Sequence, residues 1–176
     1  PPASGKEYAE QLNAEMEKIG VGKIASVMGR YYVMDRDNNY DRVKLAYDAM
    51  TKGEGLTAAC GVCGIQESYD RGETDEFVKP TLAMEDGKPV ALVQDGDSII
   101  FFNFRPDRAR EITWALTGNL PADAAMDTEK LALNFVCTTQ YDENLSLPIA
   151  FPPESIERTF GEYISSLGLK QLRIAE

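Results

Sequence analysis

The sequence predicts an α/β fold in which helices cover a mixed sheet in a three-layer-like arrangement. Segments with a helical period alternate with short apolar strands, and the middle of the chain changes to a strand–turn–strand pattern that predicts an inserted hairpin. With 176 residues, 43% of them apolar, the chain is long enough to form one substantial core. We therefore expect residues 1–176 to form a single domain.

The first half of the chain reads as three helices and one strand. Ser4 and Glu7 have capping-box spacing before an apolar stripe, which predicts a helix over 4–19 that ends at Gly20. An apolar strand over 23–28 follows. The next helix ends at Gly53, and a third extends over 57–71; the inner face of the second is expected to hold Tyr40, Val43, Tyr47 and Met50.

The second half contains most of the predicted strands. The turn signal Asp86-Gly87-Lys88 predicts a hairpin between 81–85 and 89–93. The nearly continuous apolar run 98–104 predicts a strand buried on both faces. The remaining elements are expected to be a turn at 95–97, a helix over 109–117 that ends at Gly118, a strand over 131–138, a helix over 154–167 and a strand over 169–174.

The charge balance and composition exclude several classes of function. The net charge of −11 repels phosphate on average, so we expect no nucleic-acid binding. The chain has no His, which excludes His-activated nucleophiles and imidazole-ligated metal sites. The sequence shows no signal peptide and no apolar stretch long enough to span a membrane, and its odd number of cysteines indicates a reducing compartment, so we expect a cytoplasmic protein.

The three cysteines do not form a secreted disulfide framework, because their number is odd. Cys60 and Cys63 form a C-x-x-C pair, which in a reducing compartment is compatible with a redox function. They lie in an Ala/Gly-rich stretch without the flanks of a thioredoxin-type site, so we interpret them as small buried packing residues.

Paired arginines follow two of the predicted strands. Arg30 and Arg36 come after strand 23–28, and Arg105 and Arg108 come after strand 98–104. Ligands of open α/β sheets bind beyond the carboxyl ends of strands, and the guanidinium fork suits phosphate and carboxylate. Surface Arg–Asp pairing is the simpler alternative for any single arginine, but two doublets at two junctions favour a site for a small anion.

Three carboxylates lie beside these arginines. Asp35, Asp37 and Asp107 are expected to orient the guanidinium groups. The sequence contains no G-x-S-x-G, P-loop or G-x-G-x-x-G motif, and we assign it no catalytic residue, metal ligand or cofactor. The residues alone therefore indicate anion binding without a complete active site.

The segments that carry the arginines resemble those of one family. Gly29 to Asp37 reads G-R-Y-Y-V-M-D-R-D and closely resembles the G-R-Y-Y-x-M-D-R-D segment of the cofactor-independent (2,3-bisphosphoglycerate-independent) phosphoglycerate mutases. Four further segments resemble the family in the same order: Asp75–Pro80, Phe101–Arg110, Thr139–Asp142 and Gln171–Glu176. The resemblance extends over essentially the whole chain.

This resemblance implies that the chain is the inserted phosphotransferase, or substrate-binding, domain of a two-domain enzyme. The family is an isomerase of glycolysis that interconverts 3-phosphoglycerate and 2-phosphoglycerate through a phosphoserine. That serine and two manganese ions are expected on an alkaline-phosphatase-like domain of the same parent chain, which is itself expected to be monomeric. By motif, Arg30, Arg36, Arg105 and Arg108 match substrate-binding arginines.

The chain also departs from the family pattern. It begins with Pro1-Pro2 rather than Met, which suggests an excised piece, and the family's Asp-Gly-Arg-Asp and Thr-Glu-Lys-Tyr segments and a substrate-site histidine are missing. The hypothesis is therefore a chain that folds, binds phosphoglycerate weakly and has no mutase activity alone. A stand-alone module for small anions is the alternative function, and a thiol redox protein is a second rival.

Overall fold

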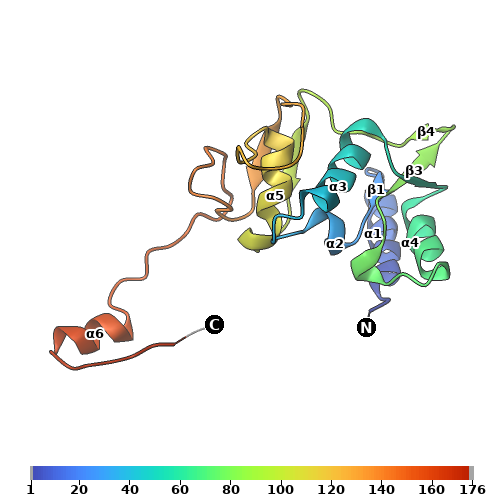
Figure 1. Ribbon diagram of the computed structural model, residues 1–176. Helices are drawn as coiled ribbons and strands as arrows, with labels where there is room; N and C mark the ends of the chain where they lie inside the picture. The colour runs from blue at the N-terminus through green and yellow to red at the C-terminus, as the bar shows by residue number, and fades with distance from the viewer. Residues whose placement is uncertain (1, 175–176) are drawn as a thin grey trace.

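The computed structural model describes residues 2–174, and Figure 1 shows their arrangement. Helices and strands alternate along this part of the chain, so the predicted α/β class and mixed sheet are confirmed. The helices are α1 (Gly5–Ile19), α2 (Arg30–Val33), α3 (Tyr40–Lys52), α4 (Gly61–Asp70), the 3₁₀ turn η1 (Asp75–Phe77), α5 (Pro106–Thr117) and α6 (Phe160–Ser166). The strands are β1 (Ser26–Val27), β2 (Leu56–Ala58), β3 (Thr81–Glu85), β4 (Lys88–Pro89), β5 (Ser98–Phe101) and β6 (Asn134–Cys137).

The strands divide into two small sheets. In the first, β3 lies between antiparallel β1 and parallel β2, and β4 pairs with β3 as the predicted hairpin. Helix α4 packs against this sheet, and α1 packs against α4. In the second sheet, β5 and β6 are parallel, with Ser98 opposite Asn134 and Phe101 opposite Cys137.

The main core lies between α3, α5 and the β5–β6 sheet, which are neighbours in Figure 1. Helix α3 has the predicted inner face: Val43 and Tyr47 are fully buried, and Tyr40 is nearly so. Helix α5 contributes Ile112 and Leu116. This packing brings the N-terminal end of α5 beside the segment that leads into α3, although the two are far apart in sequence.

Several predicted boundaries are wrong. Residues 56–58 form strand β2, so the third helix begins at Gly61 rather than at 57. The parallel pairing with β3 outweighs the local helical pattern there, because tertiary hydrogen bonds override weak propensity. The final helix is shorter than predicted, and residues 169–174 form no strand. Figure 1 shows α6 at the end of an arm that extends away from both sheets, where no neighbouring strand is available to pair with this segment.

The run 98–104 is not buried on both faces, as the sequence predicted. Its side chains alternate, and on the outer face Ile100, Phe102 and Phe104 are 76%, 94% and 77% exposed. The main core, which includes Ile112 and Leu116 of α5, covers the other face, where Phe101 makes edge-on contacts with Phe135 and Tyr141. One covered face and one open face give the period of two that is typical of a half-buried strand.

The N-terminal helix is capped from outside its own sequence. Ser4 precedes α1, but its side chain makes no capping bond, so the predicted capping box does not form. Instead the carboxylate of Asp75 accepts the N–H groups of Ser4 and Gly5 at 2.9 and 3.0 Å. Among the described residues, no helix is long and apolar enough to cross a membrane.

Candidate functional site

Arg36 and Arg105 meet at one carboxylate. Arg105 donates to Asp107 from Nε at 2.7 Å and from Nη2 at 3.0 Å, and Arg36 Nη1 donates to the same carboxylate at 3.3 Å. These hydrogen bonds, from Arg105 first, hold the pKa of Asp107 at about 2. The structure thus brings two of the four predicted arginines together, from the two predicted junctions.

Arg108 joins the same two junctions through the backbone. It lies in the first turn of α5, and its Nη1 donates to the carbonyl oxygen of Met34 at 2.9 Å. Arg105 immediately precedes α5 and Pro106 is its first residue, which suits a helix start because proline lacks the N–H that would be unpaired there. Arg36, Arg105 and Arg108 therefore lie at the N-terminus of α5, where the helix dipole adds partial positive charge.

The end of β5 is held in place by a buried tyrosine. The hydroxyl of Tyr141 lies 2.9 Å from the carbonyl oxygen of Phe101 and 2.5 Å from that of Asn103, and it accepts the N–H of Thr138 at 3.2 Å. The side chain of Asn103 in turn accepts the N–H of Arg105 at 3.0 Å. These bonds determine where the chain leaves the sheet and so the position of Arg105.

Arg30 lies at the other end of α2 and pairs with a different carboxylate. Its Nη2 donates to Glu76 of η1 at 2.8 Å, and both side chains are about half exposed. The preceding Gly29 is required by close packing, because a Cβ there would lie 2.2 Å from the carbonyl oxygen of Glu76. Its N–H donates to Val78 at 2.7 Å, which fixes the start of α2 against η1.

The three predicted aspartates have different surroundings. Asp107 contacts two of the arginines, as described. Asp35 is buried and accepts the N–H of Asn39 at 2.8 Å and that of Asp37 at 3.0 Å, and its arginine partner is Arg42 at 3.4 Å rather than one of the four. Burial alone would raise the pKa of Asp35, but these hydrogen bonds outweigh it and lower the pKa. Asp37 is exposed and contributes its backbone N–H to Asp35.

Glu111 is an ionisable residue beside the site that sequence reasoning missed. It lies on α5 one turn after Arg108 and is 3% exposed. Burial, with the nearby charge of Asp35, raises the pKa of Glu111 to about 7, against the opposing hydrogen bond from Asn38 N–H. Glu111 lies three residues after Arg108 and on the same helix face as the buried Ile112 and Ala115. A glutamate at such a position is the signal that would have identified it.

Two further charged residues also escaped the sequence analysis. Arg42 binds Asp35 and lies 4.0 Å above the ring of Tyr31, and Glu76 binds Arg30. Arg42 follows the segment Gly29–Asp37 and Glu76 lies within the segment Asp75–Pro80, so proximity to these motifs was the available signal.

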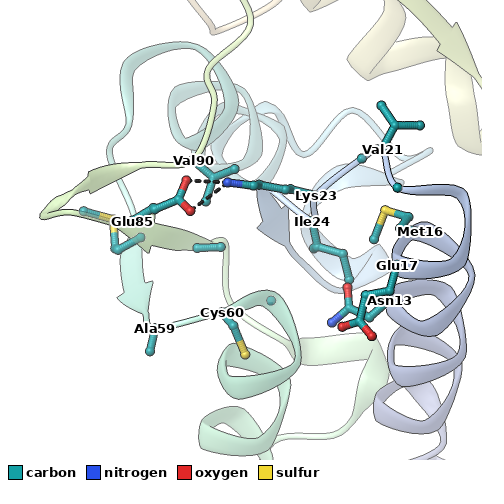
Figure 2. Close-up of a pocket in the computed structure, with 15 residues that line it drawn as sticks. Asn13, Met16, Glu17, Val21, Lys23, Ile24, Ala59, Cys60, Glu85 and Val90 are labelled. Atoms are coloured by element: carbon teal, nitrogen blue, oxygen red, sulfur yellow. Dashed lines mark hydrogen bonds and ion pairs between the residues drawn. The ribbon is translucent and has the colours of Figure 1, made fainter.

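A cavity away from these arginines lies at the other end of the fold. It measures about 720 Å³ and is bounded by α1, the β3–β4 hairpin and the start of α4, and none of the four arginines lines it. Figure 2 shows Lys23 and Glu85 paired across it, with Met16, Ile24 and Cys60 around its wall. Cys60 and Cys63 are half-buried and joined in a disulfide, so their interpretation as buried packing residues is wrong.

The two arginines that meet at Asp107 keep exposed hydrogen-bond donors. Arg36 and Arg105 have side chains that are 43% and 51% exposed, so their unused N–H donors face solvent. Each exposed pair with Asp107 contributes at most about 1 kcal/mol to stability, and the carboxylate leaves the other N–H donors of both arginines available to an anion. Guanidinium groups held by a carboxylate can still offer paired donors to phosphate or carboxylate.

Comparison with known proteins gives a consistent family. The protein-family model described as the BPG-independent PGAM (phosphoglycerate mutase) N-terminus matches residues 1–143. The chain is 55% identical to the 2,3-bisphosphoglycerate-independent phosphoglycerate mutase of Clostridium perfringens over 99% of its length, and 56% identical to that of Acetivibrio thermocellus over its whole length. It spans only 34% and 35% of those two proteins.

A solved structure has the same fold. The crystal structure of Leishmania mexicana phosphoglycerate mutase at low cobalt concentration superposes with a TM-score of 0.75 at 25% identity, over 94% of this chain and 32% of that one. Because the family model matches most of its residues, the chain belongs to the family of the BPG-independent phosphoglycerate mutase N-terminus.

Proposed function

We propose that this chain binds the substrate in a cofactor-independent phosphoglycerate mutase. In that reaction 3-phosphoglycerate and 2-phosphoglycerate interconvert through a phosphoserine, which we assign to a second domain of the same parent chain. The observation that carries the proposal is the meeting of Arg36 and Arg105 at Asp107, at the N-terminus of α5, in a member of this family. The stand-alone anion module has no support from relatives about three times as long as this chain.

The arginines have complementary tasks in this proposal. Arg36 and Arg105 present exposed donors beside a helix N-terminus and bind the phosphoryl group, while Arg108 holds the Met34 carbonyl and so keeps the two junctions together. Arg30, one helix away, is suited to the carboxylate end of the substrate. Holding both ends orients the glycerate hydroxyl that receives the phosphoryl group.

The rest of the chemistry is assigned outside this chain. Within residues 2–174 no group of three or more acidic, histidine or cysteine side chains is arranged to hold a metal ion. Following the family resemblance, we assign the two manganese ions to the other domain and derive no step through them. We further propose that the parent enzyme is a monomer that acts in glycolysis in the cytoplasm.

Binding is tested by an NMR titration of the chain with 3-phosphoglycerate at low salt, with inorganic sulfate as the nonspecific ion. We expect saturable shifts around Arg36, Arg105 and Arg108. They should be lost in Arg105→Ala and retained in Arg173→Ala, which removes an exposed arginine on the C-terminal arm. Shifts of equal size with sulfate, or their survival in Arg105→Ala, would contradict the proposal.

An assay of the same preparation separates binding from catalysis. We expect no conversion of 3-phosphoglycerate to 2-phosphoglycerate, because the chain supplies arginines but no assigned nucleophile or metal site. Turnover proportional to the concentration of the pure chain would show that this division of labour is wrong.

A further inference from the structure

A buried carboxyl group on α5 has one oxygen without a hydrogen-bond donor. Oε1 of Glu111 accepts the N–H of Asn38 at 3.0 Å. Oε2 is buried and has no hydrogen-bond partner among the described residues. Leaving a buried carboxylate oxygen unpaired is costly, so the site calls for a donor that neither neighbouring backbone segment supplies.

The group that faces Glu111 is a second buried carboxyl. Asp35 is 4% exposed, and the two carboxyls accept successive backbone N–H groups of one turn: Asp37 and Asn39 donate to Asp35, and the residue between them, Asn38, donates to Glu111. Two ionised carboxylates have no proton to share, so a hydrogen bond between them requires that one be protonated. Asp35 already accepts the N–H groups of Asp37 and Asn39, which favour its ionised form, and the proton therefore belongs to Glu111.

Titratable and charged groups from three segments surround the pair. From the segment before α3, Asp35 and Asp37 add negative charge and raise the pKa of Glu111. From α3, Tyr40 is a neutral phenol whose own pKa is raised by burial and by Glu111, Asp123 and Asp35, while Arg42 binds Asp35. On α5 itself, Arg108 is directed to the carbonyl of Met34.

The pair spans the residues on either side of Arg36. Asp35 precedes it, and Asn38 follows it in a left-handed conformation with φ of 60°, which asparagine tolerates better than most residues. Asn38 donates to Glu111, and the amides on either side of Asn38 donate to Asp35, so a proton shared by the two carboxyls would attach both ends of this short segment to α5. The helix that receives these contacts is the one that also begins beside Arg105.

We propose that Glu111 is a positioning residue for Arg36: a proton held between Glu111 and Asp35 fastens segment 35–38 to α5 and so fixes Arg36 against Asp107 and Arg105. The inference rests on the proposed function for its consequence in substrate binding. When Glu111 loses its proton to water, two buried carboxylates face each other. Their repulsion loosens the segment, and Arg36 loses its fixed place in the site.

The test compares the chain with Glu111→Gln across pH 5.5 to 9. Glutamine keeps an oxygen for the Asn38 N–H and offers an N–H to Asp35, so it mimics the protonated acid at every pH. Carboxyl ¹³C signals follow Glu111, and ¹⁵N signals follow the Asn38 amide and the Arg36 guanidinium. We expect the three signals to titrate together near neutral pH in the unaltered chain, and the Asn38 and Arg36 signals to stay constant in the variant.

Affinity for 3-phosphoglycerate provides the second measurement. The ligand's phosphate also titrates in this range, so the informative quantity is the ratio of the two affinities at each pH. Between pH 6 and 8.5 we expect the affinity of the unaltered chain to fall about fivefold or more relative to that of Glu111→Gln. A change of about fivefold is the lower end of typical couplings between two sites. Glu143→Gln, at an exposed glutamate, should keep the ratio at its starting value.

The outcomes separate the two proposals. If Arg36 and Asn38 do not follow Glu111, or if the affinity ratio is independent of pH, the positioning role is wrong while the proposed function stands. If 3-phosphoglycerate does not bind at any pH, the proposed function fails, and the Arg36 signal by itself still supports or overturns the fastening of the segment. A purely structural glutamate would lower the stability of variants without producing a titration at Arg36.

Discussion

Arg36 and Asp107 are 71 residues apart in the chain and are joined by a salt bridge of 3.3 Å. This contact connects the segment after α2 to the first turn of α5. It is where the two arginine-bearing junctions become one site, because Asp107 also holds Arg105 in a two-point contact.

Asp107→Asn should weaken binding of 3-phosphoglycerate with little effect on stability. The neutral amide no longer orients Arg36 and Arg105 by charge, so more side-chain freedom is lost on binding. The side chain of Asp107 is 39% exposed, so we expect the free energy of unfolding to change by less than about 1 kcal/mol. Isothermal titration and urea unfolding measure the two effects, and Asp127→Asn, at an exposed aspartate, is the matched control. Tighter binding by Asp107→Asn would show that the carboxylate competes with the ligand rather than orienting its partners.

Asp75→Ala should destabilise the chain by about 1 to 2 kcal/mol, the usual value of a helix N-cap. The substitution leaves the N–H groups of Ser4 and Gly5 without their acceptor, and it also removes the partner of the Tyr69 hydroxyl. Burial would raise the pKa of Asp75, but its hydrogen bonds lower it below 3.8. Its contribution is therefore present above about pH 4 and is lost as the pH falls through the lowered value. Urea unfolding at pH 7 and near pH 3 measures both effects. Glu7→Gln changes a residue of the capping box that does not form, so it should be nearly neutral. An equal loss of stability in both variants would mean that the capping box does contribute.

Tyr141→Phe should cost about 1 to 3 kcal/mol, because the backbone carbonyls of Phe101 and Asn103 lose the hydroxyl beside them. Tyr141 is 2% exposed, so water does not readily replace the hydroxyl. Thermal unfolding measures the loss, and Tyr163→Phe on the exposed face of α6 serves as the comparison. An unchanged melting temperature for Tyr141→Phe would mean that these carbonyls find other donors.

Glu111→Gln should stabilise the chain at alkaline pH. In the unfolded chain Glu111 ionises near 4.5, whereas in the folded chain it keeps its proton up to about 7. The folded state therefore binds more protons in this window, and the free energy of unfolding falls as the pH rises through it and stays low above it. At about 1.4 kcal/mol per pKa unit, this shift lowers the free energy of unfolding by roughly 3 kcal/mol between low and high pH. Glutamine does not titrate, so the variant does not lose this stability. Urea unfolding at pH 4.5 and pH 8 should show similar stabilities at the lower pH and a gap at the higher one; parallel pH profiles would refute the buried neutral acid.

The number of thiols that react with a thiol reagent should differ among the native, the unfolded and the reduced chain. Cys137 is 2% exposed, and burial raises the pKa of its thiol to about 11, so the native chain should react slowly with a thiol reagent. The unfolded chain without reductant should expose one thiol, and reduction should expose all three. Reduction should leave binding of 3-phosphoglycerate unchanged, because neither Cys60 nor Cys63 lies beside the arginines. Loss of binding on reduction would favour the redox rival.

Much of the local structure follows from patterns of neighbouring residues. The helix over α3 was predictable because Tyr40, Val43 and Tyr47 repeat at the helical period and Gly53 ends it with φ of 72°. The hairpin at Asp86-Gly87 was predictable because turn chemistry is local. Strand β2 was not, because Leu56–Ala58 becomes a strand only by pairing with β3, more than twenty residues further on.

The burial of the apolar run before Arg105 shows a second limit. Phe102 and Phe104 are apolar in sequence whether or not another element covers them, and in this structure they are exposed. An apolar residue reports a tendency to be buried, whereas its actual burial depends on which elements reach it.

The sequence by itself determined the family, the α/β class and the identity of four arginines at two junctions, because motifs and short-range periodicity are properties of neighbouring residues. The tertiary structure decided which of these arginines meet, placing Arg36 and Arg105 on Asp107 and leaving Arg30 with Glu76. It also placed Glu111 beside Asp35 at the amides of residues 37–39, an arrangement that no local pattern encodes. Long-range contacts depend on how α3 and α5 pack together, and this packing is a property of the whole chain.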